Sequence, residues 1–349
     1  CGSWLFESQS TNLVPYSEDF LQWGNARTVD TANVTISPEG TNNATLVEQQ
    51  SGQTTSGSIY ITSLSLSSGT YTQSIYAKKQ NKNYIVIYDA NAARTYFNLE
   101  NGTIGTIASG STAKIEAMTN GWYRCSTTYT VTTGSVVAFY LADNDNSTIV
   151  TDNGGVYIWG AQLEQGNISS YIPTDGSTVT RNQDLCNNGG SLASINSTEG
   201  TLYFEGAALA DGGVSRVIGI SDGSYSNFVA FRYDISSSSF TSFLRGNGGT
   251  FVPQSVGGIT QTDNNKIALV WDATNFRVWL NGVQVITSAT NDLPLGLDTL
   301  SFSDAIGIEQ FTGKTKALAV WKEALSDQEL ADLTYPTPTD PTFTLDFNT

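Results

Sequence analysis

Histidine is absent from this chain of 349 residues, and cysteine and methionine are scarce, with 3 and 1 residues. Histidine is the side chain best suited to proton transfer near neutral pH and the commonest ligand of transition metals. Its absence excludes Ser-His-Asp and Cys-His catalysis, and zinc or copper sites are not expected. The cysteines Cys1, Cys125 and Cys186 are too few and too scattered for a zinc cluster or a disulfide framework, so at most one bridge can form.

Charged residues are also scarce, at 14% of the chain, and basic residues are the rarer kind. The 32 acidic residues outnumber the 16 basic ones and leave a net charge of -16 at pH 7. Such a surface repels phosphate backbones and anionic membranes, so nucleic acid is not an expected partner. No apolar run approaches the roughly 20 residues that span a bilayer, so we expect no membrane insertion.

Period-two alternation of apolar and polar residues dominates the sequence, and helical periodicity is nearly absent. A twisted antiparallel sheet with one wet face has to bury its apolar face against a second sheet. The pattern therefore predicts an all-β fold of two antiparallel β-sandwich domains in tandem. The expected strands are 58–66, 70–78, 84–89, 95–99, 122–131, 135–142 and 155–163 in the first half, and 200–209, 216–220, 228–235, 266–272, 276–280 and 314–321 in the second.

The expected domains are residues 1–185 and 186–335, followed by a Pro-rich linker and the start of a further segment at 336–349. Residues 171–188 are polar and turn-rich and predict a linker or wrapping segment. Residues 4–7 and 343–347 look like strands at two cut edges. Because Met118 is the one methionine, we expect the chain to be a processed product or a piece of a longer one.

One short helix is expected near the end, at residues 324–333. Ser326 and Glu329 have the spacing of a capping box, in which each satisfies a free backbone donor. Leu325, Leu330 and Leu333 form an apolar stripe, so we expect the helix to pack on an edge of the second sandwich.

Motifs in the first half resemble a jelly-roll domain that recurs in bacteriophage tail-fibre and adhesin proteins and is similar to carbohydrate-binding modules. They are TNLVPYSEDF at 11–20 with Trp23, GWYR at 121–124, GVYIWGAQLE at 155–164 and SYIP at 170–173. The resemblance spans roughly residues 1–185 and implies the domain type, while no sugar-contacting residue is carried over from it.

The second half resembles a laminin-G or concanavalin-like lectin domain. The motifs are IALVWD at 267–272, FRVWLNGV at 276–283 and GKTKALAVWKEALSDQEL at 313–330, where a strand leads into a short capped helix. Members of that group bind sugars or proteins, and some cleave glycans, so the fold alone assigns no activity. Together the two modules look like the C-terminal part of a phage tail or fibre protein.

Glycan hydrolysis needs two carboxylates in one cleft, and concanavalin-like hydrolases often set them on one strand. Neither E-x-D-x-E nor E-x-D-x-x-E occurs in the chain, and strand carboxylates such as Glu164 and Glu205 stand alone. The chain is therefore not expected to be an enzyme.

One structural calcium is a possible cofactor, because carboxylates are the hard oxygen ligands that calcium prefers. The candidate ligands are Asp143 and Asp145 in the DNDN loop, together with Asp152. The alternative is a solvated turn.

Sugar binding relies on flat aromatic faces, which the 7 Trp, 16 Tyr and 15 Phe supply amply. Trp122, Trp159, Trp271 and Trp321 lie in dense apolar strands and are expected to be structural. Trp279 is the favoured ligand-binding residue, because it is flanked by polar Arg277 and Asn281. The other candidates lie in polar loops or on the wetter strand face, with edge-of-core packing or a protein interface as the alternative; they are Trp23, Tyr16, Tyr225, Phe228 and Phe251.

Cys1 followed by small residues resembles the start of a mature lipoprotein, but residues 4–6 look like a packed strand, so a fragment cut explains it better. Cys1 and Cys186 flank the first domain and could form a disulfide bridge that closes it. Cys125 is expected to be a small buried hydrophobic residue.

The sequence thus predicts a non-catalytic glycan-binding or adhesion part of a phage tail fibre, located extracellularly on the virion surface. Its expected partners are a host-surface polysaccharide and other fibre subunits, with the chain itself a homo-oligomer. The alternatives are an assembly module without sugar binding, and a cell-surface lipoprotein that captures glycans.

Overall fold

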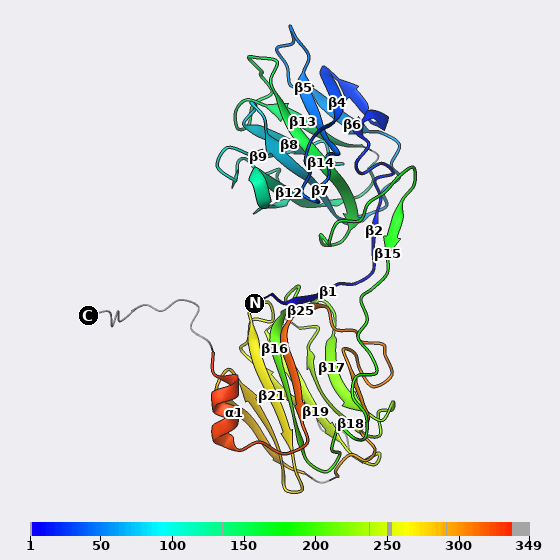
Figure 1. The fold of residues 1–349 in the computed structure, drawn as a ribbon, viewed down its shortest axis with the longest axis vertical. Helices are drawn as coiled ribbons and strands as arrows, with labels where there is room; N and C mark the ends of the chain where they lie inside the picture. Colours follow the sequence, from blue (N-terminus) through cyan, green and yellow to red (C-terminus); the bar gives the residue numbers. More distant parts are fainter. Residues whose placement is uncertain (1, 135, 237, 250–252, 291, 337–349) are drawn as a thin grey trace, which may run out of the picture. The chain divides into compact units, whose positions relative to one another are not determined.

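The computed structural model describes residues 2–134, 136–236, 238–249, 253–290 and 292–336 of the chain. These residues form two compact units (Figure 1). One is Gln9–Asn182; the other combines residues up to Ser8 with those from Gln183 onward. The expected boundary near residue 185 lies close to the observed one. Cys1, Phe251 and the strand-like stretch 343–347 lie outside the described residues.

The unit Gln9–Asn182 is a β-sandwich whose elements follow the alternation of the sequence. Its strands are β2 (Ser10–Asn12), β3 (Gly24–Ala26), β4 (Thr28–Thr35), β5 (Ala44–Gln49), β6 (Ser58–Ile61), β7 (Gly69–Lys79), β8 (Tyr84–Tyr88), β9 (Arg94–Asn98), β10 (Thr103–Ile104), β11 (Thr112–Ala117), β12 (Trp122–Val131), β13 (Val137–Ala142), β14 (Gly155–Gln165) and β15 (Val179–Arg181), with 3₁₀ turns η1 (Phe20–Gln22) and η2 (Thr119–Gly121).

Two six-stranded antiparallel sheets make this sandwich, in the orders β10-β9-β8-β13-β6-β3 and β11-β12-β7-β14-β5-β4. Alternate residues of each strand point inward to one core, which Ile59 and Ile87 enter from the first sheet and Ile75 and Cys125 from the second. Cys125 is fully buried, as expected, and burial raises the pKa of its thiol. Trp122 and Trp159 are also buried, on the outer side of the second sheet.

The other unit is a second sandwich, which also has one helix. Its elements are β1 (Trp4–Phe6), β16 (Gly200–Ala208), β17 (Arg216–Ser221), β18 (Phe228–Tyr233), β19 (Ser239–Arg245), β20 (Gln254–Gly257), β21 (Asn265–Trp271), β22 (Asn275–Leu280), β23 (Val283–Ala289), β24 (Thr299–Ser301), β25 (Gly313–Trp321) and α1 (Asp327–Thr334).

Its sheets run β1-β25-β16-β21-β22-β23 and β20-β19-β18-β17-β24, with a core that includes Phe204, Phe231 and Trp271. The strand β1 corrects the expected domain assignment: it was placed in the first domain, but Trp4 pairs with Thr315 and Phe6 with Gly313 of β25. Phe6 enters the core of this unit, where its ring stacks on Phe302 at 4.5 Å. Burial of that ring explains why residues 2–8 belong here.

The helix α1 carries the capping box expected from Ser326 and Glu329. It packs on the outer face of the sheet that contains β21 and β22 (Figure 1), where Leu330 is fully buried, and not on an edge as expected. The aromatic and aliphatic side chains on that face give it a wide apolar support. Within the described ranges, no helix combines the length and apolar character that a bilayer crossing needs.

The all-β antiparallel fold class is confirmed, and all 13 expected strands and the helix occur; their ends are shifted except for β12, whose bounds are as expected. Several strands that cover or extend the sheets were not expected from the sequence, such as β4, β5, β11, β19 and β23. Most of these strands mix half-buried and exposed residues, so their alternation is weak in the sequence.

Candidate ligand-binding sites

Trp279, the favoured ligand-binding residue, is covered by protein. It lies on β22 and is only 8% exposed, in the cluster that Leu330 of α1 closes. The alternation did place Trp279 on the face opposite the core, but α1 packs there. The prediction that it presents an aromatic surface to a sugar is therefore wrong.

Trp23 is likewise a core residue and not a surface platform. It is 5% exposed, lies between the rings of Phe20 and Phe139, and donates its indole N–H to the Tyr16 carbonyl at 2.8 Å. Tyr16 is half-buried and packs on the same core. Tyr16 and Trp23 therefore contact each other as part of the core and do not form a ligand site.

Tyr225 and Phe228 line one pocket of about 330 Å³ in the second unit. Their rings meet edge to face at 5.8 Å, and Phe228 is buried while Tyr225 is 38% exposed. The pocket lies over the outer side of β17, β18 and β19, beside the segment that follows β24. Its remaining lining residues are Val217, Arg232, Phe243, Asp304, Ile308 and Glu309.

The polar groups of this pocket are largely engaged. The Tyr225 hydroxyl donates to Oδ2 of Asp304, whose Oδ1 accepts the Ile308 N–H at 2.6 Å. Burial, then the Asp304 carboxylate, raises the pKa of Tyr225, so its phenol stays protonated and is unsuited to abstract a proton. Arg232 donates through Nε to Asp234 at 3.1 Å and lies over the Phe243 ring.

The three candidate calcium ligands meet protein partners instead. Asp143 and Asp152 converge on the ammonium of Lys82, which is buried with its side chain 0% exposed. Asp145 turns away and accepts hydrogen bonds from the N–H and hydroxyl of Thr106. In the described part of the chain no group of three or more acidic or cysteine side chains is placed to hold a metal ion. The expected three-carboxylate site is thus corrected, since a lysine supplies the positive charge.

An aromatic surface that was not expected from the sequence lies on the first sheet of the unit Gln9–Asn182. Residues of β6, β8, β9 and β13 that alternate with the core residues point to the outer side of that sheet. Most of these side chains are half-buried, and Tyr96 is buried among them. We call this surface the tyrosine face; it consists of Tyr60, Tyr84, Tyr88, Tyr96, Tyr140 and Arg94.

The strand register sets the spacing of these rings. Ala138 lies opposite both Tyr60 and Tyr88, so the two tyrosines flank a small residue. They stand two strand spacings apart, about 10 Å. The ring of Tyr60 lies over Gly24, where an added Cβ would come within 2.5 Å of it. At the other end of the face, Asn98 donates to the Tyr84 hydroxyl at 3.0 Å.

Arg94 lies over two of the rings. Its Cζ atom is 5.1 Å from the centre of the Tyr88 ring and 5.2 Å from that of Tyr140. The rings themselves are 5.4 Å apart and tilted by 50°. Such cation–π contacts fix the plane of the guanidinium and stabilise it on the sheet.

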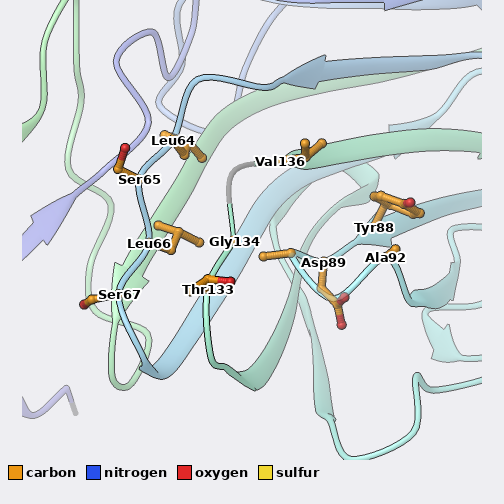
Figure 2. A pocket seen from close by; sticks show the side chains of 11 residues that line it. Leu64, Ser65, Leu66, Ser67, Tyr88, Asp89, Ala92, Thr133, Gly134 and Val136 are labelled. Carbon is orange, nitrogen blue, oxygen red and sulfur yellow. The ribbon is translucent and has the colours of Figure 1, made fainter.

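Beside the tyrosine face, in the same unit, lies a pocket of about 750 Å³ (Figure 2). Three loops build this loop pocket: the one before β7, the turn after β8, and the one before β13. Tyr88 lines it, so the pocket continues the tyrosine face. The other lining residues are Leu64, Ser65, Leu66, Ser67, Asp89, Ala90, Ala92, Thr133, Gly134 and Val136.

Among the described residues that line the loop pocket, Asp89 is the one that carries a charge. Its Oδ1 accepts the N–H groups of Asn91 and Ala93 and so shapes the turn after β8. Burial raises the pKa of this carboxyl, although the two backbone hydrogen bonds act in the opposite direction. Asp89 thus has a structural role in holding the pocket wall.

A signal for the tyrosine face is present in the sequence. Tyr84, Val86 and Tyr88 alternate with Ile85 and Ile87 in the run YIVIY. Such a strand has two apolar faces, which predicts that one covers the core and the other is covered or binds something. Which face is inward depends on the register with distant strands.

Neither a family model nor a curated protein matches the chain. Among solved structures, the chain is similar to the CBM40 of the Ruminococcus gnavus IT-sialidase bound to α2,3-sialyllactose, at 15% identity and a TM-score of 0.35, covering 40% of this chain and 84% of that one. It is also similar to the NanB sialidase of Streptococcus pneumoniae, at 18% identity and a TM-score of 0.36, covering 43% of this chain and 26% of that one. A third is a heptameric SAP-like pentraxin from Limulus polyphemus, at 16% identity and a TM-score of 0.34, covering 42% and 72%.

Proposed function

We propose that this protein is a non-catalytic glycan-binding protein, and that the tyrosine face with the adjoining loop pocket is its binding surface. The observation that supports this most is the row of half-exposed tyrosine rings across neighbouring strands, held in place by Gly24, Asn98 and Arg94.

Pyranose rings have apolar faces that stack on aromatic side chains, while their hydroxyls hydrogen-bond to polar groups at the rim. Tyrosine offers both properties, because its ring is flat and its hydroxyl donates and accepts. A rigid sheet fixes the rings before binding, so little conformational entropy is lost. The extended face and the pocket beside it suit a sugar chain better than a compact small molecule.

The absence of catalysis is part of the proposal. Hydrolysis of a glycosidic bond uses two carboxyl groups about 5 to 10 Å apart. The loop pocket has Asp89 as its one lining carboxylate, and backbone N–H groups occupy one of its oxygens. In the smaller pocket, Asp304 is engaged by Tyr225 and Ile308. Incubation with bacterial polysaccharides should release neither reducing ends nor unsaturated products.

We further propose that the glycan belongs to a host cell surface and that the chain acts as part of a phage fibre or a similar extracellular adhesin. The resemblance of the motifs at 11–20, 121–124 and 155–164 supports this setting. A surface poor in charge suits it as well, and other fibre subunits would then be partners.

A glycan array followed by calorimetry on the full chain tests the proposed function. We expect Tyr88→Ala and Tyr140→Ala each to weaken binding roughly tenfold, since each removes a central stacking surface. Tyr157→Ala is the matched control, because Tyr157 is half-buried on the other sheet of the same unit. An equal loss of affinity in all three variants would contradict the assignment of the tyrosine face as the binding surface. If no polysaccharide binds and the chain forms a stable trimer or filament, the assembly role replaces glycan binding.

A further inference from the structure

Arg94 is one of two arginines of the described chain, with Arg124, that lie over tyrosine rings and have no hydrogen bond or ion pair. Acidic residues outnumber basic ones two to one, yet no ion pair or hydrogen bond joins Arg94 to another described residue. By contrast, Arg277 pairs with Asp272 and Asp327, and Arg216 and Arg245 donate to backbone carbonyls. On a protein with a net charge of -16, a cation without an acidic partner needs a reason.

The nearby acidic groups are engaged elsewhere. Oδ1 of Asp89 accepts hydrogen bonds from the backbone N–H groups of its own turn. Asp145 accepts two hydrogen bonds from Thr106. Neither pairs with Arg94, so its charge is available to a ligand.

The geometry of Arg94 presents one edge of the guanidinium outward. Its Nε is buried without a hydrogen-bond partner, and the guanidinium lies over the rings of Tyr88 and Tyr140. The two terminal nitrogens lack a partner within the described chain and, unlike Nε, are not fully buried. A planar pair of N–H donors of this kind matches the two oxygens of a carboxylate.

We propose that Arg94 makes the tyrosine face selective for acidic sugars, by binding the carboxylate of a uronic or sialic acid unit while Tyr88 and Tyr140 pack against the ring. This inference rests on the proposed glycan-binding function and names the chemical class of the ligand. Long-range repulsion between the acidic protein and an acidic glycan makes the local cation necessary. Neutral sugars still stack on the tyrosines but lack the charge-assisted pair.

The test compares acidic polymers with their neutral counterparts on the full chain. The probes are polygalacturonate, alginate and polysialic acid, each beside its carboxyl-reduced form, with dextran sulfate as a further arm. We expect at least one carboxylated polymer to bind about tenfold more tightly than its reduced form, as one charge-assisted hydrogen-bond pair supplies. Arg94→Gln should remove this preference, because it lowers the affinity for the carboxylated polymer more than the affinity for the reduced polymer.

Arg232→Gln is the matched control, since Arg232 also lies over an aromatic ring but in the other unit. Loss of the preference in Arg232→Gln but not in Arg94→Gln would overturn the inference, as would equal binding of acidic and reduced polymers. Tighter binding of dextran sulfate than of every carboxylated polymer would overturn the choice of a carboxylate. Failure of all polymers to bind, neutral ones included, would instead overturn the proposed function.

Discussion

The ammonium of Lys82 lies 2.6 Å from Oδ1 of Asp152 and 3.2 Å from the carbonyl oxygen of the same residue. It also pairs with Asp143, and its side chain is fully buried. Two carboxylates and a carbonyl around one positive charge are the kind of ligand set that a hard cation takes. In this chain a covalently attached ammonium has that position.

Replacing Lys82 with methionine should destabilise the protein by about 3 kcal/mol, because it leaves two carboxylates close together without a counter-charge. Chemical denaturation measures the difference. Lys79→Met is the control: Lys79 pairs with Glu100 at the surface, so its loss should cost less than about 1 kcal/mol. Equal effects of the two changes would show that burial of the Lys82 pair contributes nothing.

Stability should also fall at low pH through this cluster. Hydrogen bonding from Lys82 holds the pKa of Asp152 below its ordinary value of 3.8. The stabilisation is therefore fully present above pH 3.8 and is lost as the pH falls through the lowered folded-state value. Melting curves from pH 2 to pH 6 should show the difference between the wild type and Asp152→Asn shrinking only below about pH 4. A difference that is constant over this range would contradict the prediction.

Removing the lysine should create a calcium response. In Lys82→Ala the oxygens of Asp143 and Asp152 lose their ammonium, so a divalent cation can take its place with water completing the shell. With a dissociation constant near 1 mM, about 5 mM calcium would stabilise the variant by roughly 1 kcal/mol. Melting with calcium against EDTA checks this. Calcium should stabilise the wild type less than the variant. Equal stabilisation of both proteins would show that any calcium site lies elsewhere.

The burial of Trp279 beneath α1 predicts a structural role. Trp279→Ala should cost about 3 kcal/mol, as a cavity forms between the sheet and Leu330. Trp4 of β1 is 75% exposed, so Trp4→Ala should change stability by no more than about 0.5 kcal/mol. Chemical denaturation measures the stability of each variant, and calorimetric titration with a polysaccharide that the wild type binds measures its affinity. Loss of binding in a stably folded Trp279→Ala would contradict this role.

The sequence by itself determined the fold class, the positions of most strands and the capped helix. These depend on local properties: alternation places successive side chains on opposite faces, and the capping box joins residues three apart. The missing histidine likewise excluded whole classes of catalysis without any structure.

Only the tertiary structure decided which outward faces are free. Trp279 and Tyr88 both alternate with core residues, but α1 covers the first, whereas the second stays half-exposed beside the loop pocket. Lys82 and Asp152 are 70 residues apart, and β1 joins a strand more than 300 residues away. Such pairings follow from strand register and from the burial of distant surfaces against one another, which no local pattern encodes.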